Sequence, residues 1–216
     1  MQTRVSTNPV DKVAGLALPL MPETIPAHDE SKSLEDAWTA LMNSMYARKR
    51  AAFLLAYPGV GLGHKQWRPT WEQVMTETLP VNQCSVLEYV EHDDETDEDS
   101  FEGSCIEKGH VRGLDVESVE GGDRSGELVV EGADGMQHTF AIRATHQILI
   151  PEGTYTLLGS IPGLDDDDIW GQYWAVGLRL PRRRFQKVSV VMMEDKEDIE
   201  RLEGLGIAAK FRNILV

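Results

Sequence analysis

Three things are scarce or absent in this sequence: long apolar runs, cysteine and an apolar N-terminal segment. No run of about 18 apolar residues occurs, so the sequence predicts no transmembrane helix. The start, MQTRVSTNPVDK, lacks the apolar segment of a secretory signal. The two cysteines, Cys84 and Cys105, are too few for a disulfide scaffold. Together these absences predict a reducing, intracellular setting, the cytoplasm.

Positive charge is also in short supply. The 216 residues include 21 Lys and Arg against 36 Asp and Glu, which gives a formal net charge of −15. Such an acidic excess repels phosphate backbones and anionic lipid, so nucleic-acid and membrane partners are disfavoured. Hydrophobic residues make up 41% of the chain, enough for a substantial core. A protein partner is therefore expected, while the identity of any small-molecule ligand stays open.

Recognisable catalytic motifs are missing as well. The sequence has no GxSxG, HExxH, paired CxxC or Walker loop. The glycines of 59–63 resemble a nucleotide loop, but His64 replaces the third glycine and Pro69 blocks the helix that should follow, so a connecting loop is favoured. His138 and His146 could face each other across strands, yet a catalytic zinc usually has three protein ligands. No cofactor and no catalytic residue is predicted.

What the sequence does contain is β-structure. Apolar residues alternate in both arms of Tyr173–Met193, on either side of a basic turn that contains proline, and this pattern predicts a β-hairpin. Asp134-Gly135 marks a second hairpin, and Asp195 caps a helix that precedes a terminal strand at 211–216. Counting both hairpin arms and the terminal strand, we expect about ten strands. The remaining strands are expected at about 84–90, 104–108, 110–118, 127–131, 137–143, 145–150 and 154–160.

The predicted fold class is α+β, mainly β: a curled or closed, barrel-like antiparallel sheet. Helices from the N-terminal part pack on it, and one helix lies near the C-terminus. Residues 1–80 are expected to form a helical, mixed part and 81–216 the β domain, with a single domain overall as the alternative. The helical part includes predicted helices at 34–48 and 71–78 and a buried Trp38. The short apolar run Ala51–Tyr57 predicts a buried strand instead.

The register of the hairpin Tyr173–Met193 can also be predicted. An odd-numbered loop pairs Leu178 with Val188 and Val176 with Val190, which keeps apolar side chains together on one face. An even loop places Val176 opposite Ser189 and so puts polar groups on that face. Because burying an unpaired polar group costs about 1–3 kcal/mol, the odd register is expected.

Two acidic stretches interrupt these elements. The segment Glu91–Glu102, EHDDETDEDSFE, shows neither helical nor strand periodicity and lacks the glycine of a Ca²⁺-binding EF-hand loop. A solvated, mobile loop is predicted there, so deleting about ten of its residues should leave melting almost unchanged. The run Asp165, Asp166, Asp167, Asp168 favours the same interpretation. With Trp170 close by, these four aspartates are weak candidates for metal ligands.

Aromatic residues supply the candidate ligand-binding groups. Trp67 and Trp71 flank Arg68 and could form a stacking shelf for a ligand. The alternative, which we favour, is that they fill a gap between a helix and the sheet, since buried aromatics commonly dominate core packing. The ligand-binding candidates are Trp67, Arg68, Trp71, Trp170 and Trp174.

Several phrases of the sequence occur together in a known context. They are TNPVDKVAGLA (7–17), SLEDAWTAL (33–41), WRPTWEQVM (67–75), HTFAIRATHQILIPEGTYTLLGS (138–160) and the hairpin WAVGLRL…FQKVSV. Their order and wording resemble the region that follows the heterokaryon-incompatibility domain in many mushroom-type fungal proteins. The resemblance implies a link with fungal non-self recognition and programmed cell death. The incompatibility domain itself, similar to TIR-type signalling modules, is expected upstream and outside this chain.

Two hypotheses of function follow. The first is a non-enzymatic recognition or regulatory domain, which the absent motifs and the resemblance favour. The second is a metal-assisted hydrolase whose site is built from the acidic loops, Asp165–Asp168 above all. No catalytic residue is carried over from the resemblance, because this region has no established catalytic motif. The chain is therefore expected not to be an enzyme.

Overall fold

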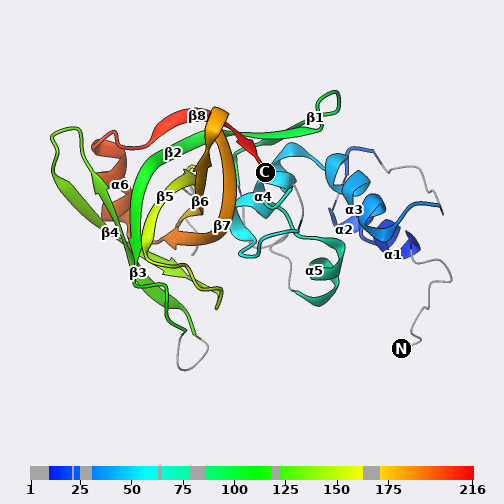
Figure 1. Ribbon diagram of the computed structural model, residues 1–216, viewed down its shortest axis with the longest axis horizontal. Coiled ribbons are helices and arrows are strands. Elements are labelled where there is room, and N and C mark those ends of the chain that lie inside the picture. Colours follow the sequence, from blue (N-terminus) through cyan, green and yellow to red (C-terminus); the bar gives the residue numbers. More distant parts are fainter. Residues whose placement is uncertain are drawn as a thin grey trace.

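The computed structural model describes residues 10–20, 22–24, 31–62, 65–77, 86–117, 122–162 and 171–216. Within these ranges the chain forms six α-helices and one 3₁₀ turn. Helices α1–α5 gather at one end of the molecule and α6 lies at the other, with the strands between them (Figure 1). The bounds are α1 Val10–Gly15, α2 Ala17–Leu20, α3 Leu34–Asn43, α4 Ala47–Ala56, α5 Trp71–Thr76, η1 Pro181–Arg183 and α6 Lys196–Gly204.

The strands form one sheet that closes into a ring. Around the ring the order is β2–β3–β4–β7–β6–β5 and back to β2, while β1 and β8 pair with the first part of β2. These pairings are antiparallel, and β7 with β8 is parallel. The predicted α+β, mainly antiparallel fold is confirmed. The bounds are β1 Val90–Asp93, β2 Glu98–Arg112, β3 Arg124–Glu131, β4 Gln137–Ala144, β5 Gly153–Gly159, β6 Gln172–Leu180, β7 Arg184–Met193 and β8 Ala209–Leu215.

Strand β2 joins the two ends of the molecule. It has 15 residues. The first ones pair with β1 beside the helices, and the last ones pair with β3 as part of the ring (Figure 1). The ladder between β2 and β5 is irregular between Ile106 and Gly109. A Cβ atom on Gly109 would lie 2.6 Å from methyl groups of Leu128 and Leu157, so this close approach needs glycine. The sequence prediction had divided this strand into 104–108 and 110–118.

The largest error in the predicted secondary structure concerns helices α3 and α4. The run Ala51–Tyr57 is not a strand: all but Tyr57 belong to helix α4, which packs against β1 and β6. The predicted helix 34–48 ends at Asn43, where the Arg50 guanidinium donates to the main-chain oxygens of Asn43 and Met45, both at 2.7 Å. Arg50 thus supplies the donors that the next helical turn would otherwise provide to these carbonyls, and α3 and α4 are separate helices. Residues 145–150, also predicted as a strand, are irregular.

The hairpin Tyr173–Met193 is confirmed as β6 and β7, but its predicted register is wrong. Val176 lies opposite Ser189, and a bulge at Val188 then places Lys187 opposite Gly177. A three-residue turn closes the hairpin although it has no glycine; Arg182 and Arg183 adopt φ angles of 61° and 56°. The prediction failed because it treated buried polar groups on β7 as unpaired.

Those polar groups do find partners. The Lys187 amine and the Ser189 hydroxyl, both buried, donate to main-chain carbonyls at the end of α4 and just beyond it. The Lys187 Nζ to Phe53 O distance is 3.0 Å, and the Ser189 Oγ to Pro58 O distance is 3.1 Å. The polar face of β7 therefore fastens the ring to the helices.

The interior contains two apolar cores. The first combines residues of α1–α5 with strand residues such as Phe101, Leu158 and Phe185, so helices and ring share it. Trp38 is fully buried there, as predicted; its rings lie 6.2 Å from those of Phe53 and Trp71. The second core fills the ring under α6. Among the described helices, none is long and apolar enough to cross a membrane.

Candidate functional site

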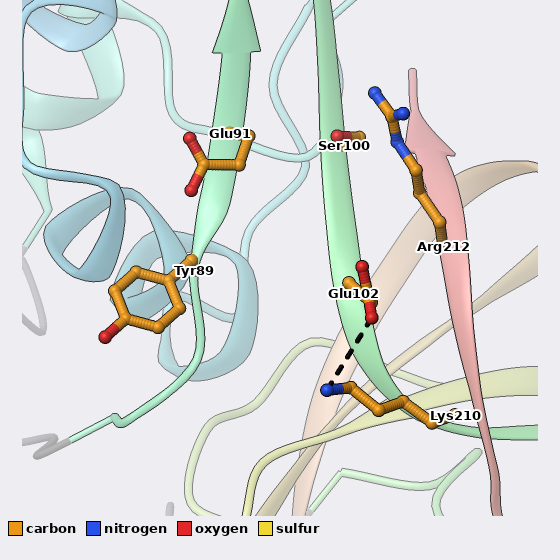
Figure 2. Close-up of a pocket in the computed structure, with 6 residues that line it drawn as sticks. All are labelled: Tyr89, Glu91, Ser100, Glu102, Lys210 and Arg212. Carbon is orange, nitrogen blue, oxygen red and sulfur yellow. Dashed lines mark ion pairs between the residues drawn. The ribbon is translucent and has the colours of Figure 1, made fainter.

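The outer side of strands β1, β2 and β8 carries a cluster of polar side chains. Cross-strand pairing places Glu91 opposite Ser100, and Glu102 opposite Arg212. Because paired residues point to the same side of a sheet, these side chains share one surface. They line a groove of about 450 Å³ (Figure 2). We name this surface the charged face; its residues are Tyr89, Glu91, Ser100, Glu102, Lys210 and Arg212.

The charges on this face are sorted by strand. The acidic side chains come from β1 and β2, and the basic ones come from β8. Lys210 lies 3.6 Å from Glu102 in an exposed ion pair. Glu91 and Arg212 stand on opposite sides of Ser100 (Figure 2), and neither forms an ion pair within the described part of the chain. The face therefore presents one negative and one positive group that are open to a partner.

An exposed tyrosine completes the charged face. The Tyr89 hydroxyl accepts hydrogen bonds from Arg48 at 2.8 and 3.2 Å, and the Arg48 guanidinium lies 5.1 Å from the ring centroid. Tyr89 is nevertheless 47% exposed, and Tyr46 and Leu87 are exposed as well. Tyrosine and arginine are the residue types that most often dominate binding energy at protein interfaces.

A buried polar network holds the face in place from below. The Asp99 carboxylate lies 2.8 Å from Nδ1 of His92 and 3.1 Å from the Lys65 amine, and it accepts a hydrogen bond of 3.1 Å from the Trp67 indole. Lys65 also pairs with Asp97 at 2.6 Å. Asp99 is only 1% exposed, so its charge is balanced inside the protein. The network ties the β1–β2 hairpin to the loop that precedes α5.

The prediction of a mobile loop at Glu91–Glu102 is therefore wrong. The segment forms most of β1, a turn and the start of β2; Phe101 within it and Val90 just before it are fully buried. Acidic composition indicated solvation, but His92 and Asp99 point inward, where Lys65 and Trp67 bind the carboxylate.

Most of the aromatic candidates from the sequence lie inside the protein. Trp67, Trp71 and Trp174 are buried, and Arg68 is 6% exposed. Burial lowers the pKa of Arg68 below its ordinary value, while the nearby carboxylates, first that of Asp99, raise it again. These positions agree with gap filling rather than with a stacking shelf. Trp170 and the metal candidates Asp165–Asp168 lie outside the described residues, as does Cys84.

A second buried polar group, around Ser189 and His146, resembles a nucleophile with its base. The Ser189 hydroxyl donates to Pro58 O at 3.1 Å and lies 3.3 Å from His146 Nε2. His146 Nδ1 accepts from the Ile148 N–H, so its proton resides on Nε2, which donates to Val190 O at 2.8 Å. Burial lowers the pKa of His146, which keeps the ring neutral. A ring nitrogen that already carries a proton cannot accept one from serine, so this pair is structural.

Metal ligands do not converge in the described ranges, where no group of three or more His, Cys, Asp or Glu side chains could hold an ion. His138 lies at the start of β4 and His146 beyond its end, so they do not face each other. Cys105 is buried and its pKa is raised to about 11, first by burial and then by Glu107. That thiol is therefore a weak nucleophile.

Sequence reasoning missed all six residues of the charged face. One signal was present: Phe101, Gly103 and Cys105 alternate with polar residues and extend the predicted strand at 104–108 backwards. That extension would have placed Ser100 and Glu102 on the outer side. The acidic composition of the stretch concealed it.

Comparisons with family models, with curated proteins and with solved structures gave no match for this chain.

Proposed function

We propose that the chain is a non-enzymatic recognition or regulatory domain that binds a polypeptide partner through the charged face. The observation that carries the proposal is the pairing of opposite charges on neighbouring strands beside exposed Tyr89. The resemblance of the sequence to the region behind fungal incompatibility domains favours the same class of function, non-self recognition. The site chemistry of the described residues adds no nucleophile with a free base that would favour an enzyme.

A polypeptide fits this face better than other ligand classes. A net charge of −15 repels nucleic acid. A ligand complementary to Glu91 and Arg212 carries both signs of charge at a fixed spacing, and the side chains of a polypeptide supply this. Complementary charges of this kind contribute chiefly to specificity and to the rate of association.

A peptide selection tests the proposal. A random peptide library is selected on the wild-type chain and on the variant Lys210→Glu with Arg212→Glu. We expect the wild type to enrich peptides with acidic residues spaced to meet β8, and the variant to lose them, because like charges then oppose each other.

The matched control carries Lys108→Glu with Lys196→Glu, which changes the net charge equally at exposed positions outside the charged face. It should enrich the same peptides as the wild type. Enrichment that is identical for all three proteins would contradict the proposal.

A further inference from the structure

The charged face is complementary to itself. Its acidic side chains lie to one side of β2 and along it, and its basic side chains lie on the other side, on β8 (Figure 2). We propose that the polypeptide partner is a second copy of this chain, which binds face to face about a twofold axis. The inference rests on the proposed function and names the partner for that same face.

The symmetry follows from the strand order β1–β2–β8. A twofold axis that lies in the interface, parallel to β2, exchanges the two sides of the face. The β1 strand of each copy then crosses over the β8 strand of the other. Such a contact is isologous: whatever one copy offers, the other receives in the same way.

The individual charges agree with this arrangement. Glu91 lies opposite Ser100, and Arg212 lies opposite Glu102, two residues further along β2. The Arg212 side chain extends back, so that its guanidinium reaches the level of Ser100 (Figure 2). In the symmetric pair each Glu91 therefore meets an Arg212, twice per dimer. The exposed ring of Tyr89 lies beside this contact and contributes apolar area.

The overall charge disfavours contact between acidic surfaces and favours contact at a face that carries basic side chains. Two chains of charge −15 repel each other, and the repulsion is screened beyond about 8 Å at physiological salt. Close contact is therefore possible where cationic side chains face outward beside acidic ones. A second copy carries the same acidic side chains on β1 and β2 and the same basic side chains on β8, so it supplies both signs of charge that this face needs.

A charge-swap experiment tests the inference by analytical ultracentrifugation at about 150 mM salt. The acidic variant carries Lys210→Glu with Arg212→Glu, and the basic variant carries Glu91→Lys with Glu102→Lys. We expect the wild type to associate reversibly with rising concentration. Each variant alone should associate at least about tenfold more weakly, since like charges then meet.

Mixing the two variants provides the decisive arm. In a mixed pair acidic side chains face basic ones at every substituted position. This includes position 102 on the axis strand β2, where two wild-type copies place Glu102 against Glu102. Association should therefore be at least as strong as that of the wild type. The control Lys108→Glu with Lys196→Glu should associate like the wild type. Thermal melting of each variant establishes that it is folded.

Two results would overturn the inference. One is a wild-type chain that stays monomeric at every concentration; the other is a mixture of folded variants that does not associate. If in either case the peptide selection still depends on Lys210 and Arg212, the proposed function stands and only the second copy is excluded. If selection and association are both insensitive to these substitutions, both proposals fail.

Discussion

Lys187 on β7 has its amine fully inside the protein, between the ring and the helices. Nζ donates to the main-chain oxygens of Phe53, Tyr57 and Trp67 at 3.0, 2.5 and 3.4 Å. Phe53 and Tyr57 lie in the last turn of α4 and just after it, where helix carbonyls lack partners within the helix. A neutral amine has two N–H groups, and the two shortest contacts, with the Phe53 and Tyr57 oxygens, satisfy two acceptors that the fold buries.

We expect Lys187→Met to lower the free energy of unfolding by about 1–3 kcal/mol, because the carbonyl oxygens stay buried without a donor. Burial lowers the pKa of Lys187 well below its ordinary value, so the unfolded chain binds the extra proton up to about pH 10.4. The Lys187 contribution to stability therefore rises with pH in that window.

Chemical denaturation of the wild type and of Lys187→Met, near pH 7 and near pH 10, checks this expectation. The titratable groups that both proteins share cancel in the difference between their free energies of unfolding. The deficit of Lys187→Met should be larger at the higher pH. An equal deficit at both pH values would mean that the three carbonyls keep the amine charged inside the protein.

At the scale of elements, the β1–β2 hairpin depends on one buried carboxylate. We expect Asp99→Ala to cost about 3–5 kcal/mol, because Lys65 and His92 lose their buried partner. Asp94, whose side chain is 97% exposed, offers the control in the same hairpin: Asp94→Ala should unfold at nearly the wild-type denaturant concentration. Equal midpoints for the two variants would show that the network does not hold the hairpin.

Helix α6 protects an exposed edge of the ring. Strands β4 and β7 pair at Arg143 and Met192 and then separate, which leaves backbone groups of β4 open. Asp198 accepts from the Ala141 N–H at 2.9 Å, and Arg201 donates to Thr139 O at 2.6 Å. Two side chains of one helix thus replace a neighbouring strand and discourage pairing with another chain.

Local patterns predicted the elements whose boundaries are set nearby. Asp195 caps α6, and Gly135 with φ 76° turns the β3–β4 hairpin, both as expected from the sequence. The run Ala51–Tyr57 misled because a fully buried helix and a buried strand show the same apolar run. In the structure, Arg50 of this helix donates to the main-chain oxygens of Asn43 and Met45, and these contacts mark the break between α3 and α4.

The charged face could not be predicted from the sequence because its support depends on residues that are distant along the chain. Composition describes how a segment interacts with water, but Asp99 is stabilised by Lys65 and Trp67, more than 30 positions away along the chain. No local pattern predicts such a contact. The bulge at Val188 likewise depends on carbonyls of α4 that β7 meets only in the folded protein.

On the scale of the whole molecule, β2 and the hairpin it forms with β1 join the helices to the ring (Figure 1). The same strands carry the charged face on their outer side and part of the first core on their inner side. Deleting the segment Glu91–Glu102 would therefore remove β1 and expose that core. Its loss should cost several kcal/mol, in contrast to the effect expected for a solvated loop.

The central claim is that the acidic segment is an ordered part of the sheet and builds the recognition surface. Amide hydrogen exchange at single-residue resolution tests it most directly. Amides paired between β1, β2 and β8 should exchange slowly, with protection approaching that of the β6–β7 hairpin. Exchange throughout Glu91–Glu102 at the rate of an unstructured peptide would contradict the account.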